Sequence, residues 1–354
     1  MGEVFIGSEA VSSARLTRHE LQRSYRPIFR SVDVPKHSPP SLRDRTVGAW
    51  LASDRQAVIA GASASALHGA EWVDDDIPIE LISKRARPQR GVLVRNETLV
   101  DDEITRVAGL PVTTRTRTTF DLGRHLPRGE ALARLDALMR AQVFSAEDVL
   151  LLAKRHQGQR GLRQLRELLP LVDGGAASPK ETWLRLLFID AGLPRPTTQI
   201  PVIDERGRLV RILDMGWEEF IVGAEYDGDQ HRTNREQYVK DLRVWPKLER
   251  MGWNVTRVIK EDREDDIIAR TWSAMVSRGW NPETHVLPGS SRTSSAEGSL
   301  SARMCGLNQL PGTGTSPSGG APAGGAAPGA AAVGSARMNG TAADRRLPSW
   351  TTRL

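Results

Sequence analysis

The sequence predicts an α/β protein in three parts: an α+β region, a three-layer domain with a mixed sheet, and a disordered tail. Hydrophobic periodicity over residues 179–278 predicts a helix, three strands, a helix, a strand and a helix, which suits one sheet covered on both faces. Before it, short strand-like runs alternate with amphipathic helices. From about residue 288 onward, large apolar residues are too few to offset the entropy of ordering. We therefore place the parts at residues 1–174, 175–284 and 285–354.

The first part is predicted to contain helices and two short strands. Val47, Trp50 and Leu51 recur at helical spacing, and Pro127 directly precedes another helical pattern, as at many helix starts. The expected helices are residues 42–53, 63–68, 114–126, 128–142, 146–155 and 161–169, and the expected strands are residues 77–83 and 91–96.

The second part follows a segment of small residues, 173–179, which we take as the domain boundary. Ser178 is a good N-cap, Pro179 suits the first helical turn, and Glu181 completes a capping box. Residues 204–207 should join the first two strands as a hairpin. The expected elements are a helix at 179–191, strands at 198–203, 209–214 and 220–227, a helix at 235–251, a strand at 253–259 and a helix at 262–278.

The overall composition indicates the cellular compartment of the protein but says little about its function. The net charge is +6, but the tail from residue 285 carries six arginines and two acids, which leaves only +2 for the rest. A nucleic-acid partner therefore needs a local basic face. The single cysteine, Cys305, lies in the tail, which fits a reducing cytoplasm. Because no apolar run approaches the roughly 20 residues that span a bilayer, we expect neither secretion nor membrane insertion.

The most informative feature is the run of residues 225–231, which follows the strand-like residues 220–224. Successive strand residues point to opposite faces, so Glu225 and Asp227 share one side of the sheet. The glycine between Asp227 and Asp229 permits a sharp turn that would bring His231 back toward them. Two carboxylates and an imidazole at the end of a strand predict a metal site with proton transfer.

Two further acids lie at suggestive places in the same part. Asp214 ends the second strand, beside Glu225 on the third, and Glu181 lies on the first helix. Hard oxygen ligands of this kind hold Mg²⁺, which polarises a phosphate and activates water. In the alternative interpretation, Glu181 is only a capping residue and Asp214 only ends a strand. Asp227 then belongs to an ordinary Asp-Gly turn, and His231 caps or packs a helix.

These motifs resemble the DUF559 family, a branch of the PD-(D/E)XK nuclease superfamily that is similar to very-short-patch-repair endonucleases. The matching segments are residues 178–185, 211–214, 225–231, 241–243 and 252–255, and the resemblance covers about residues 178–278. It implies a restriction-endonuclease-like domain that hydrolyses DNA phosphodiester bonds with Mg²⁺ or Mn²⁺ as cofactor.

The resemblance assigns a role to each matching residue. The resemblance implies that Asp214 and Glu225 bind the metal, that Glu181 completes or supports the site, and that His231 transfers a proton. With the neighbouring acid added, the candidate catalytic residues are Asp214, Glu225, Asp227 and His231, and the candidate DNA contacts in this part are Arg232 and Arg243. One position departs from the superfamily pattern, because Asp227 stands where a lysine usually follows the glutamate by two positions. Arg232 or Lys240 could supply the missing positive charge.

The N-terminal half resembles a second family, the AbiEi-type antitoxins, which are transcriptional repressors of type IV toxin–antitoxin systems. The matching segments are residues 60–69 and 110–122. Members often begin with a winged helix, and residues 16–21 followed by 25–30 resemble a remnant of one. The DNA contacts that this resemblance implies are Arg18, Arg23, Arg26 and Arg30.

Two hypotheses from different functional classes follow. The leading one is a metal-dependent DNA endonuclease. The alternative is a non-catalytic, DNA-binding transcriptional regulator of the antitoxin type, with a degenerate nuclease fold and a toxin encoded nearby as partner. A weaker third hypothesis, a sugar- or nucleotide-modifying enzyme, rests on the threonine- and arginine-rich residues 113–119, and no complete nucleotide-binding fingerprint supports it. We expect the arginines of this segment to be solvated at the start of a helix.

Overall fold

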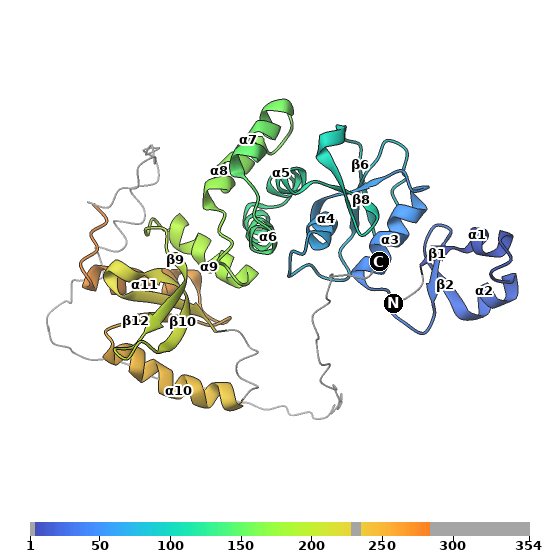
Figure 1. Cartoon of the computed structure of the whole chain (residues 1–354). Coiled ribbons are helices and arrows are strands. Elements are labelled where there is room, and N and C mark those ends of the chain that lie inside the picture. The colour runs from blue at the N-terminus through green and yellow to red at the C-terminus, as the bar shows by residue number, and fades with distance from the viewer. Residues whose placement is uncertain (1–3, 228–234, 284–354) are drawn as a thin grey trace, which may run out of the picture. The chain divides into compact units, whose positions relative to one another are not determined.

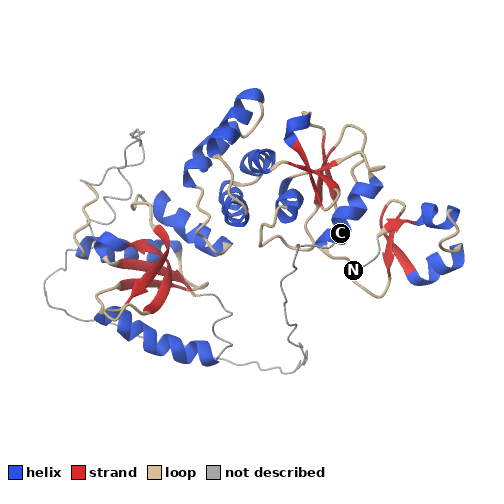
Figure 2. Cartoon of the chain, in the orientation of Figure 1, coloured by secondary structure: helices blue, strands red, loops and turns tan. Residues whose placement is uncertain are grey.

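The computed structural model describes residues 4–227 and 235–283, and only the backbone of residues 235–242. Across these residues, the strands form three separate sheets, and helices lie between and around them along the chain (Figure 1). Figure 2 shows strands and helices mixed throughout the described chain, which confirms the α/β class. Within the described ranges, no helix combines the length and the apolar character that a membrane span requires.

The N-terminal elements are β1 (Phe5–Ile6), α1 (Gly7–Ser12), α2 (Arg18–Ser24), β2 (Tyr25–Phe29) and β3 (Val32–Pro35). The strands form an antiparallel sheet in the order β1-β3-β2. A capping box begins α2, because the Thr17 hydroxyl accepts from the Glu20 amide while the Glu20 carboxylate accepts from the Thr17 amide. The sequence did not predict these strands, whereas the structure shows a β-α-α-β-β unit.

The next elements are α3 (Leu42–Ala52), β4 (Val58–Ile59), α4 (Gly61–Leu67), β5 (Ile79–Ile82), β6 (Val92–Arg95), a 3-10 helix (Asp101–Glu103), β7 (Ile104–Val107) and β8 (Leu110–Thr113). Their sheet has the order β6-β5-β4-β8-β7 and mixes parallel and antiparallel pairs. Helix α3 contacts both this sheet and β1–β3. Its Gly48 permits the close approach, since a Cβ there would lie 2.9 Å from the Ile28 side chain. Phe29, Val32 and Ile59 accordingly share one core.

Four helices and a short 3-10 helix follow, namely α5 (Arg115–His125), α6 (Arg128–Ala141), α7 (Ala146–Arg155), α8 (Leu162–Leu168) and Leu169–Leu171. The Thr114 hydroxyl caps α5 by accepting from the Arg117 amide. The helices enclose a second core around Phe120, Leu135 and Leu165, all of them fully buried.

The C-terminal elements are α9 (Pro179–Asp190), β9 (Thr197–Ile203), β10 (Leu209–Trp217), a 3-10 helix (Glu218–Phe220), β11 (Val222–Tyr226), α10 (Arg235–Arg250), β12 (Asn254–Val258) and α11 (Glu264–Ser277). The sheet order is β12-β11-β10-β9, and only the β11–β12 pair is parallel within this sheet. One face packs on α9 and α11 through Phe188, Met215 and Met275. The other packs on α10 through Leu213 and Leu248. The three-layer domain with a mixed sheet is therefore confirmed.

The predicted order of the C-terminal elements agrees with the structure, but one strand is longer than expected. The predicted hairpin turn forms, with the Gly207 amide donating to the Asp204 carbonyl over 2.8 Å. Strand β10 continues past Asp214 to Trp217, so Asp214 lies inside the strand and not at its end. The domain limits at residues 174/175 and 284/285 stay predictions, and the predicted disordered tail lies outside the described residues from residue 284 on.

Candidate functional site

Glu181 begins α9 and receives hydrogen bonds from the surrounding protein. Its own amide donates to the Ser178 hydroxyl, as the predicted N-cap requires. Its carboxylate accepts from the Ala177 amide at 2.8 Å and from the Gln199 side chain at 3.2 Å. Burial raises the pKa of Glu181, while these hydrogen bonds oppose the rise. The carboxylate therefore orders the start of α9, one residue further back than a capping box.

The segment of residues 178–185, which contains Glu181, also attaches α9 to α6. Thr182 Oγ1 donates to Asp136 Oδ2 over 2.8 Å, and Arg185 Nη2 donates to the same oxygen over 2.6 Å. The Asp173 amide donates to the other oxygen of Asp136 over 2.8 Å. Asp136 and Arg185 are both fully buried. The segment that resembles a nuclease motif thus joins the C-terminal domain to the helices before it.

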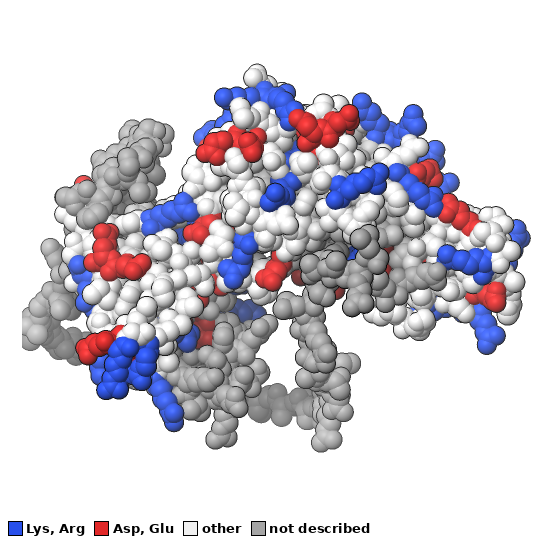
Figure 3. All heavy atoms as spheres, viewed as in Figure 1, with Lys and Arg blue, Asp and Glu red and all other residues white. Residues whose placement is uncertain are grey.

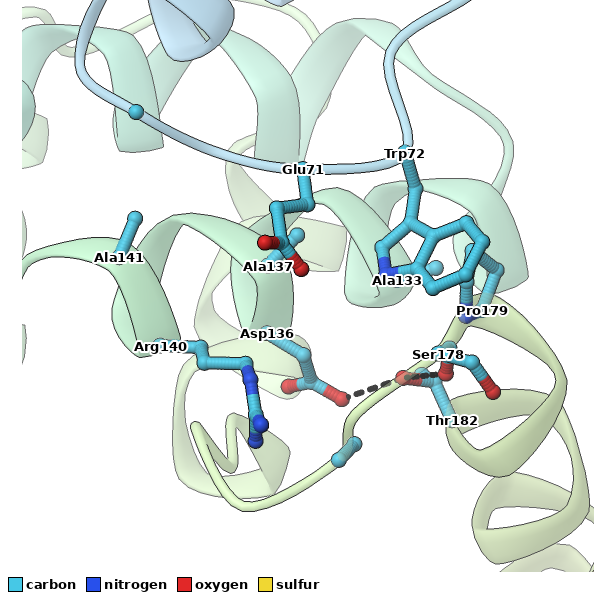
Figure 4. A pocket seen from close by; sticks show the side chains of 12 residues that line it. Glu71, Trp72, Ala133, Asp136, Ala137, Arg140, Ala141, Ser178, Pro179 and Thr182 are labelled. Carbon is cyan, nitrogen blue, oxygen red and sulfur yellow. Dashed lines mark hydrogen bonds between the residues drawn. The ribbon is translucent and has the colours of Figure 1, made fainter. Parts of the chain in front are cut away.

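A small cavity of about 170 Å³ lies at this junction (Figure 4). Trp72 closes one side, and its indole Nε1 donates to the Ala177 carbonyl over 3.0 Å. The dashed contacts of Figure 4 show Asp136 already bonded to Thr182. Ligand pockets usually enclose about 300 Å³ or more. We therefore assign this cavity to the packing of α6 against α9.

Asp214 and Glu225, the predicted metal ligands, lie on neighbouring strands, as expected. Asp214 Oδ2 accepts from the Tyr226 amide over 2.8 Å, which places its carboxylate beside the residue after Glu225. Glu225 is buried at 5% exposure, and Arg211 Nε and Nη2 donate to its two oxygens over 2.6 and 2.5 Å. The structure therefore gives Glu225 a bidentate arginine partner that the sequence argument did not consider.

Asp227, the residue in the usual lysine position, also pairs with an arginine. Arg257 Nη2 on β12 donates to Asp227 Oδ2 over 2.6 Å. Both Arg257 and Arg211 lie over the Trp245 ring of α10, with Cζ 4.7 and 4.8 Å from its centroid. Asp227 is therefore an ion-pair partner of Arg257, which the interpretation of Asp227 as an ordinary turn residue did not include.

Other predicted site residues are exposed or fall outside the described residues. Arg18 is exposed on α2, Arg26 is half-buried on β2, and Arg243 is exposed on α10. His231 and Arg232 lie outside the described residues, as does the side chain of Lys240. No role of these last three is therefore tested.

The donor set at Asp214 and Glu225 does not suit a divalent cation. Mg²⁺ binds carboxylates whose negative charge is available to it. Here a guanidinium already neutralises Glu225, and a second one neutralises Asp227. Mg²⁺ or Mn²⁺ at this place stays a prediction, and we derive no chemical step through it.

A second group of acids and histidine, which the sequence analysis missed, surrounds α5. Ligand atoms of Glu97, Asp121 and His125 all lie within 4.8 Å of one another. Arg117 and Arg124 both pair with Glu97 and with Asp121, so the group is a buried ion-pair network. The expectation that the arginines of residues 113–119 are solvated is wrong for Arg117, which is 1% exposed.

The network sets the charge state of Glu97. Burial opposes ionisation, but hydrogen bonds from His125 and Arg124 lower the pKa of Glu97 from 4.5 to about 2. Glu103 extends the network, since it pairs with Arg117 and its Oε1 accepts from His156 Nε2 over 2.7 Å. These groups hold the β7–β8 segment against α5 and α7. Their spacing along the chain gave no signal of this.

Comparisons with known proteins support the antitoxin resemblance. Residues 56–171, from just before β4 through α8, match the AbiEi antitoxin C-terminal domain. Two uncharacterized proteins of Mycobacterium tuberculosis, one from strain H37Rv and one from strain CDC 1551, are each 30% identical over 225 residues. The matched region is 63% of this chain and 82% of each relative. No solved structure matches the chain significantly. These comparisons give no support for the nuclease resemblance.

Proposed function

Because the chain belongs to the family of these two mycobacterial proteins and contains the AbiEi antitoxin C-terminal domain, we propose that it is a DNA-binding antitoxin. It would repress its own operon and act with a toxin encoded nearby. This is the alternative hypothesis of the sequence analysis, and the family match at residues 56–171 supports it better than the endonuclease hypothesis.

The β-α-α-β-β unit before the matched domain is the observation that carries the proposal. Two helices joined by a short turn and followed by a β-hairpin are the core of a winged helix. Leu21 packs against the start of α1, since a Cβ on Gly7 would lie 3.0 Å from it. The exposed residues of α2 include Arg18, His19, Gln22 and Arg23.

The charge of this unit favours a polyanion. Residues 4–37 contain six arginines and lysines against three acids, a net charge of +3, and the only other net positive part is the tail, so the rest of the chain carries a net charge of −1. Figure 3 shows basic side chains over these elements at the right of the view, with a few acids among them. Arginine and lysine contacts to phosphates supply most non-specific DNA affinity, and a helix in the major groove supplies base contacts.

Within this proposal, α2 enters the major groove and the β2–β3 turn follows the DNA backbone. Arg18 and Arg23 lie on the exposed face of α2, and Arg30 is exposed at the turn. The Arg30 amide is fixed by Gln89 Oε1 at 2.9 Å, which holds the turn against the five-stranded sheet. Arg26 is half-buried on β2, an edge strand of the β1–β3 sheet, and its contact with DNA stays a prediction.

DNA binding tests the proposal directly. We would measure fluorescence anisotropy of a labelled duplex from upstream of the gene, using the full chain. Each of Arg18→Ala and Arg23→Ala should weaken binding about tenfold and reduce the salt-dependence slope by about one unit. Arg163→Ala is the matched control, since this arginine is 93% exposed on α8. Unchanged affinity in both α2 variants, with a normal circular dichroism spectrum, would reject α2 as the DNA-reading helix.

Two further experiments address the partner and the rival activity. Co-expression with the toxin gene should relieve growth arrest, and loss of the antitoxin gene should raise operon transcription. Endonuclease activity stays the competing prediction, with Asp214, Glu225 and His231 as its residues. Incubating DNA with the protein and Mg²⁺ or Mn²⁺ decides it, and cleavage that Asp214→Ala abolishes would favour the endonuclease.

A further inference from the structure

The acid that a nuclease would use as its central metal ligand is held by a bidentate ion pair. Arg211 on β10 donates to both oxygens of Glu225 on β11, over 2.6 and 2.5 Å. Two parallel bonds between a guanidinium and a carboxylate are the strongest geometry for such a pair. Glu225 is 5% exposed, so water screens the two charges poorly.

The Trp245 indole contacts the arginine of this ion pair and the arginine of a second ion pair. The Cζ atoms of Arg211 and Arg257 lie 4.8 and 4.7 Å from the centroid of the Trp245 ring. Arg257 in turn pairs with Asp227. Each guanidinium thus has both a cation–π contact and a carboxylate partner, and together they fix its position. We call these five residues the arginine–tryptophan array.

We infer that Arg211 takes the place of a divalent cation at Glu225, and that the C-terminal domain is a metal-free form of its fold. A metal ion on Glu225 would lie close to the guanidinium, and the two positive charges would repel each other in this buried place. Admitting the ion requires Arg211 to leave both the carboxylate and the Trp245 ring.

The array also accounts for the anomaly at residue 227. A lysine there would place a third positive charge beside Arg257. Asp227 instead balances Arg257, as Glu225 balances Arg211. The inference goes beyond the proposed function, because it concerns a different domain and stands whether or not the chain binds DNA through α2.

Mn²⁺ binding to the full chain tests this inference, with the loss of the free-ion electron paramagnetic resonance signal as readout. The wild type should leave Mn²⁺ free. Arg211→Gln should bind Mn²⁺ at least about tenfold more tightly, because the repelling charge is gone. Adding Glu225→Gln to that variant should remove the gain. Arg211→Lys, which keeps the charge without the fork, should still exclude the ion.

The control and the second variant separate this effect from a general change of charge. Arg208→Gln removes an arginine of the same hairpin, one that is 64% exposed and pairs with Asp204, and should not change Mn²⁺ binding. If the Arg211→Gln protein does not fold, Arg211→Met is measured in its place, because methionine keeps the apolar part of the arginine side chain. Mn²⁺ binding by the wild type that Glu225→Gln abolishes overturns the inference. So does a folded Arg211→Gln or Arg211→Met protein that binds no more Mn²⁺ than the wild type.

Discussion

Arg185 of α9 and Asp136 of α6 form a fully buried ion pair, with Nη2 and Oδ2 2.6 Å apart. The pair connects the antitoxin-like helices to the C-terminal α/β domain. Arg185 also donates to the Leu171 carbonyl, and Asp136 accepts from Thr182 and from the Asp173 amide. One aspartate thus accepts from two side chains of α9 and from a backbone amide of the connecting segment.

Removing one partner of this pair should destabilise the chain strongly. Arg185→Leu leaves Asp136 buried without its cation, and such a loss typically costs about 3–5 kcal/mol. Urea denaturation followed by tryptophan fluorescence measures the change. Arg163→Leu breaks an exposed pair with Glu167 and should have little effect. Equal effects of the two variants would show that the buried pair does not secure the junction.

Gly61→Ala should destabilise the start of α4 for two reasons. Gly61 has a φ of +56°, and a Cβ there would lie 2.2 Å from Glu80 Oε1. The strained backbone alone costs about 1–2 kcal/mol, and displacing Glu80 from Arg95 and the Ala62 amide adds to it. Gly192→Ala is the control, since its φ is +86° but nothing lies within 4 Å of a Cβ. The difference in thermal unfolding between these variants measures the contact with Glu80.

Glu97 should stabilise the fold above its ordinary pKa and lose this contribution in acid. Its pKa is depressed from 4.5 to about 2 in the folded chain, so the stabilisation is complete above pH 4.5. It falls as the pH drops from 4.5 toward 2, by about 3 kcal/mol in total. Burial raises the pKa of Asp121, whose contribution therefore runs in the opposite direction.

Comparing the wild type with Glu97→Gln isolates this contribution. The variant should be less stable at pH 6, and the gap should narrow as the pH falls to 3. Urea midpoints across this range provide the measurement. Glu130 is an exposed acid at the start of α6, and Glu130→Gln should leave the loss of stability between pH 6 and pH 3 unchanged. A gap that stays constant with pH would contradict the assignment.

Thr17→Ala should weaken DNA binding without removing a DNA contact. The capping box orders the first turn of α2, and loss of an N-cap costs about 1 kcal/mol. If α2 must be helical to bind, affinity falls by about fivefold. Ser24→Ala, at the exposed end of the same helix, should leave affinity unchanged. A Thr17→Ala protein with wild-type affinity would argue against α2 as the contact surface.

The C-terminal fold was predictable because its signals act within a few residues. The hairpin turn at residues 204–207, Pro179 at the start of α9 and Gly252 after α10 all lie where the sequence placed them. The β1–β3 sheet was missed for the converse reason. β1 is two residues long, and so short a strand has no period to detect. Its pairing with β3 depends on residues nearly thirty positions away.

The candidate site was predicted only in part. Sequence spacing placed Asp214 and Glu225 on neighbouring strands, and the structure agrees. The Ser178 cap also forms as expected. Arg211 was seen only as part of a family motif, because strand alternation does not reveal which charge across the sheet meets Glu225. Arg117 was expected in solvent, since nothing local indicates that Glu97, Glu103 and Asp121 surround it.

The sequence alone determined the order of helices and strands in the C-terminal domain, because periodicity, caps and turns are set by neighbours along the chain. It also determined where acids occur at the ends of apolar runs. Tertiary structure alone decided what those acids contact. Ion pairs such as Glu225 with Arg211 and Asp136 with Arg185 join residues from different elements. A carboxylate becomes a metal ligand, a helix cap or an ion-pair partner according to the charge that packing brings to it. That choice depends on the distance between side chains in space.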